Sequence, residues 1–87
     1  MEPDELDIDG FEWDPDKAEA SLAKHGVSFE EAEEAVERAD LISDPYKTRG
    51  EVRYLVVGPT SMGRMLQVVI TLRGSNARII SARRYRS

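Results

Sequence analysis

The stretch MLQVVITLRGSNARIISARR, residues 65–84, decides the fold of this 87-residue chain. Apolar residues occupy its even positions from 66 to 72, whereas Gln67, Thr71 and Arg73 are polar, and this alternation is typical of a half-buried β-strand. The Gly-Ser-Asn segment that follows predicts a turn, and the β-branched residues of RIISARR (78–84) predict a further strand. Because the connection is short, the two strands are expected to be antiparallel neighbours.

A third strand precedes this pair in the sequence. Residues 51–57 also alternate, with Val52, Tyr54 and Val56 on one side. The segment GPTSMG, residues 58–63, then predicts a turn that leads into the next strand. The second half of the chain is therefore predicted to form a three-stranded antiparallel meander.

A first helix is predicted after a very short strand at FEWDP, residues 11–15. The Asp-Pro pair at 14–15 has the form of a helix start, because Asp caps free N–H groups and Pro needs no N–H at the first helical position. The helix is expected to run to about Lys24 and to end at Gly26. Its expected buried side chains are those of Ala18 and Leu22.

A second helix is predicted from the spacing of Ser28 and Glu31, which is that of a capping box. Val27 is placed to pack against Ala32, and the helix is expected to stop before Pro45, which disfavours helical geometry at the residue before it. Its glutamates are expected to face water: Glu30, Glu33, Glu34 and Glu37.

This order of elements predicts an α+β fold with two layers. A short N-terminal strand is followed by two helices, and the helices must cover the apolar face of the three-stranded antiparallel meander. Residues 11–87 are expected to form a single domain, because so short a chain can bury one modest core. Residues 1–10 are acidic and lack an apolar period, so they are predicted to be a disordered tail.

The composition excludes several classes of site. The chain has no cysteine and one histidine, His25, so neither disulfides nor cysteine-based metal sites are available. No apolar run is long enough to span a bilayer, and a cytoplasmic location is expected. The net charge of −5 hides a strong segregation, since residues 1–45 carry 16 acidic and 3 basic side chains, whereas residues 46–87 carry 1 and 9. The second half is therefore a candidate for binding an anion.

Four segments, in this order and spacing, resemble the BrnT family of RelE-like toxins from type II toxin–antitoxin systems. They are FEWDPDKAEASLAKHGVSFEEA at 11–32, GR at 63–64, TLRG at 71–74 and RIISARR at 78–84. The resemblance implies a compact antiparallel sheet with two N-terminal helices, and ribonuclease activity that arrests translation without a cofactor. It also implies a ribbon-helix-helix antitoxin of the BrnA kind, through which the complex contacts DNA, and it allows a toxin homodimer within that complex, with no membrane partner.

Metal-independent cleavage of RNA requires activation of the ribose 2′-hydroxyl, stabilisation of negative charge at phosphorus and protonation of the leaving 5′-oxygen. Arginine suits the second task because its planar guanidinium donates two hydrogen bonds to phosphate. The predicted catalytic residues are Arg64, Arg73, Arg83, Glu51 and His25. The predicted RNA-binding residues are Lys24, Arg53, Arg78 and Arg84. Arg64, Arg73 and Arg83 lie near strand ends, from which a common concave surface could form.

Each assignment has an alternative. His25 competes with Glu51 and Tyr54 for the role of general base, and it could instead cap carbonyls at the end of the first helix. Glu51 could be an ion-pair partner of a neighbouring arginine. For the protein as a whole, the alternative to a ribonuclease toxin is a catalytically weak or inactive module of the same fold, which binds the antitoxin or another acidic partner.

Overall fold

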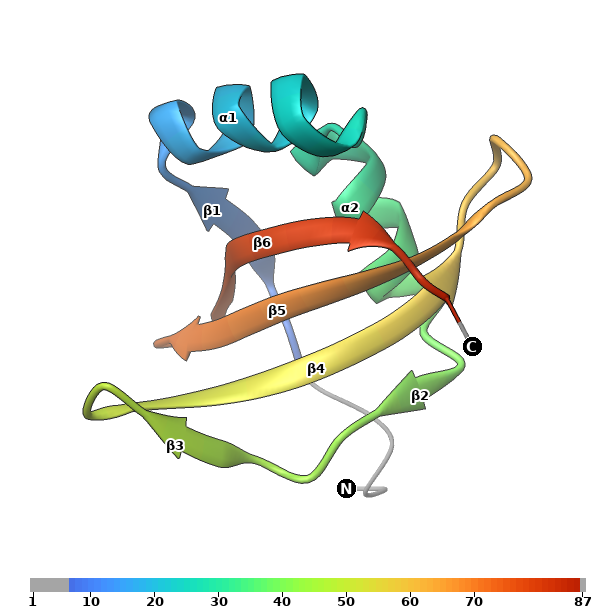
Figure 1. Ribbon diagram of the computed structural model, residues 1–87. Helices are drawn as coiled ribbons and strands as arrows, with labels where there is room; N and C mark the ends of the chain where they lie inside the picture. Colours follow the sequence, from blue (N-terminus) through green and yellow to red (C-terminus); the bar gives the residue numbers. More distant parts are fainter. Residues whose placement is uncertain (1–6, 87) are drawn as a thin grey trace.

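Six strands and two helices follow one another in the computed structural model, which describes residues 7–86 (Figure 1). The elements, in chain order, are β1 (Gly10–Trp13), α1 (Pro15–His25), α2 (Phe29–Glu37), β2 (Leu41–Ile42), β3 (Tyr46–Thr48), β4 (Glu51–Pro59), β5 (Met65–Arg73) and β6 (Asn76–Arg84). The predicted α+β class is confirmed, with two helices in one layer and the sheet in the other.

Both helices begin with the capping groups that the sequence indicates, and α1 also ends at the predicted glycine. The Asp14 carboxylate accepts a hydrogen bond of 2.9 Å from the Asp16 N–H, and Pro15 occupies the first helical turn. Gly26 ends α1 in the left-handed conformation, with φ of 68°. The Ser28 hydroxyl accepts from the Glu31 N–H at 3.0 Å, so the predicted start of α2 is confirmed.

The sheet has the strand order β1-β6-β5-β4-β2, and β3 pairs with the other end of β4. Strands β4, β5 and β6 form the predicted antiparallel meander. Strand β1 joins it in parallel beside β6, with Gly10 opposite Asn76 and Trp13 opposite Ile79. The β5–β6 register shifts between Val69 and Ile70, which leaves Ile80 without a partner on β5.

The core lies between α2 and one face of the meander. Leu66, Val68 and Ile70 of β5 are fully buried on this face, as are Phe29 and Ala32 of the helix. The helix approaches β4 so closely that a Cβ atom added at Gly58 would lie 2.1 Å from the carbonyl oxygen of Ala35. Glycine is therefore required at position 58 for close packing rather than for an unusual φ.

The structure differs from the sequence prediction between α2 and β4. Helix α2 ends at Glu37, well before Pro45, and the short strands β2 and β3, which were not predicted, follow it. Ser43 holds this segment on β4, because its N–H donates to the Leu55 carbonyl at 2.8 Å and its hydroxyl accepts from the Leu55 N–H at 2.9 Å. Pairing with the exposed edge of β4 thus satisfies backbone groups that a longer helix would have satisfied internally.

The prediction that Leu22 is buried is wrong. Its side chain is 54% exposed, and the buried residue of α1 is its neighbour Ser21. The Ser21 hydroxyl lies 3.1 Å from the carbonyl oxygens of both Val27 and Ala82, so a polar contact holds α1 against β6. Ala18, the other residue predicted to be buried, is partly buried and packs against the core. The helix therefore docks on the sheet through small residues, and Leu22 lies outside the contact.

The first strand begins at Gly10, one residue earlier than the predicted domain boundary. The Asp9 N–H donates to the Ser75 carbonyl at 2.8 Å, and Ile8 packs against the core. Residues 8–10 are thus part of the fold, whereas the remaining prediction of a disordered tail falls on residues 1–6, which lie outside the described residues.

Candidate functional site

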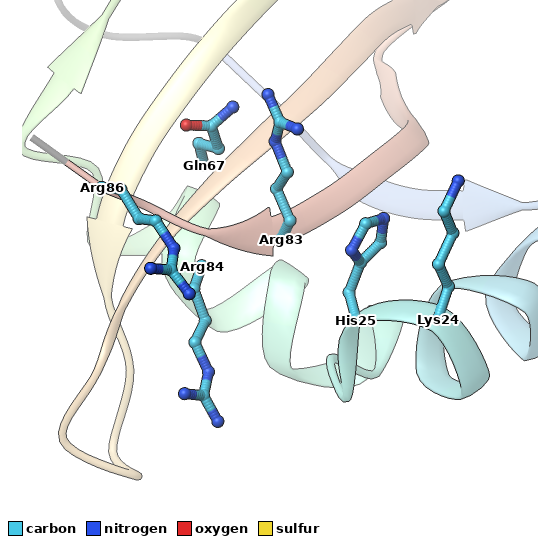
Figure 2. Close-up of a pocket in the computed structure, with 6 residues that line it drawn as sticks. All are labelled: Lys24, His25, Gln67, Arg83, Arg84 and Arg86. Atoms are coloured by element: carbon cyan, nitrogen blue, oxygen red, sulfur yellow. The ribbon is translucent and has the colours of Figure 1, made fainter.

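An open groove lies where the end of helix α1 meets the end of strand β6 (Figure 2). Its volume is about 530 Å³, which is in the range of small-ligand sites. Six residues line it: Lys24, His25, Gln67, Arg83, Arg84 and Arg86. Four of the six are residues that the sequence analysis predicted for the site: Lys24, His25, Arg83 and Arg84. The fold therefore brings these four together.

The ends of β1 and α1 explain why these residues meet. Strand β1 accompanies β6 only as far as Ile79, so the following residues of β6 have no β1 neighbour. Helix α1 lies beside them instead, held by the contact of Ser21 with the Ala82 carbonyl. Because α1 ends at Gly26, one turn after Ser21, Lys24 and His25 are placed next to Arg83 (Figure 2).

Arg83 is oriented by Gln67, its register partner on β5. When the Gln67 amide is turned so that its oxygen faces Arg83, this oxygen accepts hydrogen bonds from the guanidinium Nε at 3.0 Å and from Nη2 at 3.2 Å. This orientation satisfies both groups, whereas the reverse would place donors against donors. Gln67 thus fixes the guanidinium plane and leaves its other N–H groups for a ligand.

The groove is strongly cationic. Lys24, Arg83, Arg84 and Arg86 contribute four positive charges, and none of the six lining residues is a carboxylate. Among residues 7–86, the ion pairs that form involve other arginines. The carboxylates of the described residues therefore form no ion pair with the cations of the groove, and an anionic ligand would meet several guanidinium donors there.

A second set of predicted residues lies at the opposite end of the sheet. The Arg53 Nε lies 2.8 Å from a Glu51 carboxylate oxygen, and the Arg73 Nη2 lies 3.8 Å from the other oxygen. Arg73 is six residues along β5 from Gln67, a separation of about 20 Å at 3.3 Å per residue. Glu51, Arg53 and Arg73 therefore do not share the groove with His25.

Arg64 lies at the same end of the sheet as the groove, but it does not line the groove, and its guanidinium is bound by Glu31. Its Nε donates to Glu31 at 2.7 Å and its Nη2 donates at 2.5 Å, which makes the pair bidentate. A further bond of 2.8 Å joins Nη2 to the Gly26 carbonyl, and the Thr60 hydroxyl donates to Glu31 at 2.9 Å. The Glu31 side chain is 5% exposed, so this network ties α2, the end of α1 and the β4–β5 turn together.

The remaining predicted residue, Arg78, pairs with a glutamate of the first strand. Its Nη1 lies 3.0 Å from the Glu12 carboxylate. Arg64, Arg73 and Arg83 therefore do not converge on one concave surface, because Arg73 lies at the far end of β5 from Arg83. Arg64 lies at the groove end of the sheet, but its guanidinium donates to Glu31 and to the Gly26 carbonyl. Sequence reasoning missed Gln67 and Arg86 as groove residues. The register of β5 against β6 locates Gln67, and the run of arginines after residue 82 contained the signal for Arg86.

Acid is expected to destabilise the fold through Glu31. The hydrogen bond from Arg64 lowers the pKa of Glu31 below its usual value, despite the opposing effect of burial. A lowered pKa in the folded state stabilises the protein above the unfolded-state value of about 4.5, and this contribution is lost as pH falls through the folded-state pKa. Hydrogen bonds also lower the pKa values of Glu12, Glu34 and Glu51, whereas burial raises that of Glu33.

Urea unfolding at pH 7 and at pH 3.5 measures this effect. We expect the free energy of unfolding to fall between these values, and to fall less in Glu31→Gln, since that side chain cannot be protonated. An equal pH dependence in the variant and the wild type would show that Glu31 does not contribute.

The part of the chain that the structure describes contains neither a candidate membrane span nor a candidate metal site. Neither of its helices has the length and apolar character needed to cross a membrane. Within the same residues, histidines and carboxylates nowhere form a group of three or more suited to a metal ion.

Comparison with known proteins agrees with the fold. The crystal structure of the ribonuclease toxin BrnT from Brucella abortus superposes with a TM-score of 0.61 and 23% sequence identity, over 90% of this chain and 97% of the other. No curated protein sequence matches the chain. The family model described as "Ribonuclease toxin, BrnT, of type II toxin-antitoxin system" matches residues 13–87, which is most of the sequence. The chain thus belongs to the BrnT family of ribonuclease toxins.

Proposed function

We propose that this protein is a metal-independent endoribonuclease toxin that cleaves RNA in the groove between α1 and β6. The observation that carries the proposal is the grouping of four cationic side chains around His25, with no carboxylate in the lining. Other arginines of the chain, such as Arg64 and Arg78, are each paired with a glutamate. The groove is therefore a surface on which a phosphate is bound by guanidinium groups free to donate.

The groove residues provide two of the functions that cleavage needs. We assign His25 as the proton acceptor for the ribose 2′-hydroxyl, because it lines the groove and an imidazole ring nitrogen can accept a proton. The 2′-oxygen then attacks phosphorus, and Arg83 and Arg84 stabilise the charge that develops on the phosphate oxygens. The bond to the 5′-oxygen breaks as this oxygen takes a proton from water, and the hydroxide left behind takes up the proton held by His25. The products are a 2′,3′-cyclic phosphate and a 5′-hydroxyl.

The family also implies an antitoxin partner, because its members come from type II toxin–antitoxin systems. We propose that this antitoxin is a ribbon-helix-helix protein of the BrnA kind, that it neutralises the toxin, and that the complex contacts DNA through the antitoxin and can contain a toxin homodimer. Cleavage of RNA by the free toxin would inhibit translation in the cytoplasm. Co-expression with the antitoxin is expected to abolish this inhibition.

Incubation of the purified chain with total RNA, with and without EDTA, tests the proposed activity. We expect cleavage in both conditions, 2′,3′-cyclic phosphate ends, and no cleavage where the attacking ribose is replaced by deoxyribose. His25→Gln should lower the rate by roughly 100-fold, because it removes the proton acceptor and keeps a similar polar side chain. Binding of RNA without cleavage by the wild type would instead support the inactive binding module.

A further inference from the structure

Strands β4 and β5 separate at the end of the sheet that is remote from the groove (Figure 1). Their shared register ends at the pair of Arg53 and Thr71, although β4 begins at Glu51 and β5 continues to Arg73. In the described sheet, Glu51 pairs with β3 and Arg73 pairs with β6. The two strands therefore form a fork, of which β3–β4 is one arm and β5–β6 is the other.

A second open cavity, of about 500 Å³, lies in this fork. Its inner end is closed by the Thr71 hydroxyl, which donates to the Val52 carbonyl at 2.7 Å. The side chains of Val52 and Leu72 are 48% and 39% exposed, so the fork has apolar surface that the core does not cover. This combination of apolar walls and a few polar groups is typical of small-ligand sites.

Glu51 provides a fixed hydrogen-bond acceptor at the fork. One of its carboxylate oxygens accepts from the Arg53 Nε at 2.8 Å, while the other lies 3.8 Å from the Arg73 Nη2 and retains acceptor capacity. The hydrogen bond from Arg53 lowers the pKa of Glu51, so the carboxylate is ionised at neutral pH. Such a group is a weak base but a strong acceptor for neighbouring N–H groups of a ligand.

We propose that the fork is a nucleobase site, which selects guanine in single-stranded RNA through hydrogen bonds to Glu51. This site deepens the proposed ribonuclease function, on which it rests. Guanine presents two adjacent N–H donors on its Watson–Crick edge, which match a carboxylate, whereas adenine and cytosine present one donor next to an acceptor. Because a base exposes this edge when it is unpaired, the site requires single-stranded RNA.

The surroundings favour RNA over an inserted peptide strand. A third strand between β4 and β5 would need two strand spacings of about 4.8 Å each, and the Thr71 to Val52 hydrogen bond holds the strands closer than that. Lys47 and Arg49 are exposed beside the fork, and Arg73 lies at its mouth, so the fork attracts a polyanion. The separation of about 20 Å from the groove assigns the bound base and the cleaved phosphate to different nucleotides.

Backbone amide NMR of the full chain, titrated with guanosine 3′-monophosphate, tests the proposal. We expect saturable shifts at Val52, Leu72 and Arg73. Inosine 3′-monophosphate lacks one of the two donors and should bind about tenfold more weakly, since a hydrogen bond to a charged group is lost. Adenosine 3′-monophosphate should bind at least as weakly as the inosine nucleotide.

Two variants test whether the Glu51 carboxylate is responsible for guanine binding. Glu51→Gln should weaken guanine binding by about tenfold or more and remove most of the difference from inosine. The matched control, Glu19→Gln, changes an exposed carboxylate on α1 and should bind like the wild type. The inosine comparison uses the wild-type chain, so it decides the question even if Glu51→Gln fails to fold.

Other results would overturn the base site. Absence of shifts at the fork, or equal affinity for the three nucleotides, would show that it does not select guanine. Shifts at Arg83 and Arg84 report separately on the groove. If the chain cleaves RNA but binds the three nucleotides equally, the guanine site is wrong and the ribonuclease proposal stands. If the chain binds guanine selectively but does not cleave RNA, the ribonuclease proposal is wrong and the guanine site stands.

Discussion

Replacement of Arg83 by alanine is expected to lower the rate of RNA cleavage by about 100-fold, because one preorganised donor to the developing phosphorane charge is lost. Arg83 projects from β6 into the groove and is held there by Gln67, so no large movement is needed before it binds phosphate. Single-turnover cleavage of a short RNA measures this effect. Thermal unfolding should change little, since the side chain is exposed and forms no ion pair among the described residues.

Arg38→Ala provides the matched control for this loss. Arg38 is also an exposed arginine, but it lies at the end of α2, where it pairs loosely with Glu34 at 3.6 Å. Its replacement should leave the cleavage rate within about twofold of the wild type, because a surface pair of this kind contributes little. If Arg83→Ala and Arg38→Ala cleave equally fast, the groove is not the site of catalysis.

Replacement of Arg64 by methionine is expected to lower the melting temperature by roughly 10 °C. The change leaves the Glu31 carboxylate almost fully buried without its cationic partner, which is among the most destabilising single changes in a small domain. Circular dichroism during heating measures the shift. Arg38→Met should barely move it, since the Arg38 pair is exposed to water.

A double variant separates the loss of the Glu31–Arg64 ion pair from the other effects of removing the Arg64 side chain. Glu31→Leu combined with Arg64→Met removes both charges and should recover most of the melting temperature. Cleavage at 20 °C, where the Arg64→Met chain remains folded, should stay within a few fold of the wild type. A rate loss of 100-fold there, with normal melting, would assign Arg64 to catalysis, as the sequence suggested.

Local signals in the sequence predicted the elements of the fold well. The Asp14 and Ser28 caps and the αL glycine at position 26 depend on a few neighbouring residues, and each appears where expected. The meander also follows from alternation and short turns. Strands β2 and β3 were missed because they are too short for a period, and they exist through pairing with β4 that no local pattern records.

The sequence indicated the kind of side chains in the candidate site, but not which of them the fold brings together. The excess of arginine after residue 46 indicated that this half is a candidate for anion binding, and the fold brings Lys24, His25, Arg83 and Arg84 together. Which arginines are free depends on long-range pairs, such as Glu12 with Arg78 and Glu31 with Arg64. These pairs join residues 66 and 33 positions apart, and sequence periodicity contains no information at that separation.

The parallel ladder between the first and last strands joins Gly10 to Asn76, which are 66 positions apart in the chain. Closing so long a loop costs conformational entropy, and this ladder is expected to form late in folding and to open first under stress. The opening would release the beginning of the same strand that ends in Arg83 and Arg84. Proteolysis or a bulky fusion near the N-terminus would therefore impair the proposed RNA cleavage at the far end of the chain, without altering any groove residue.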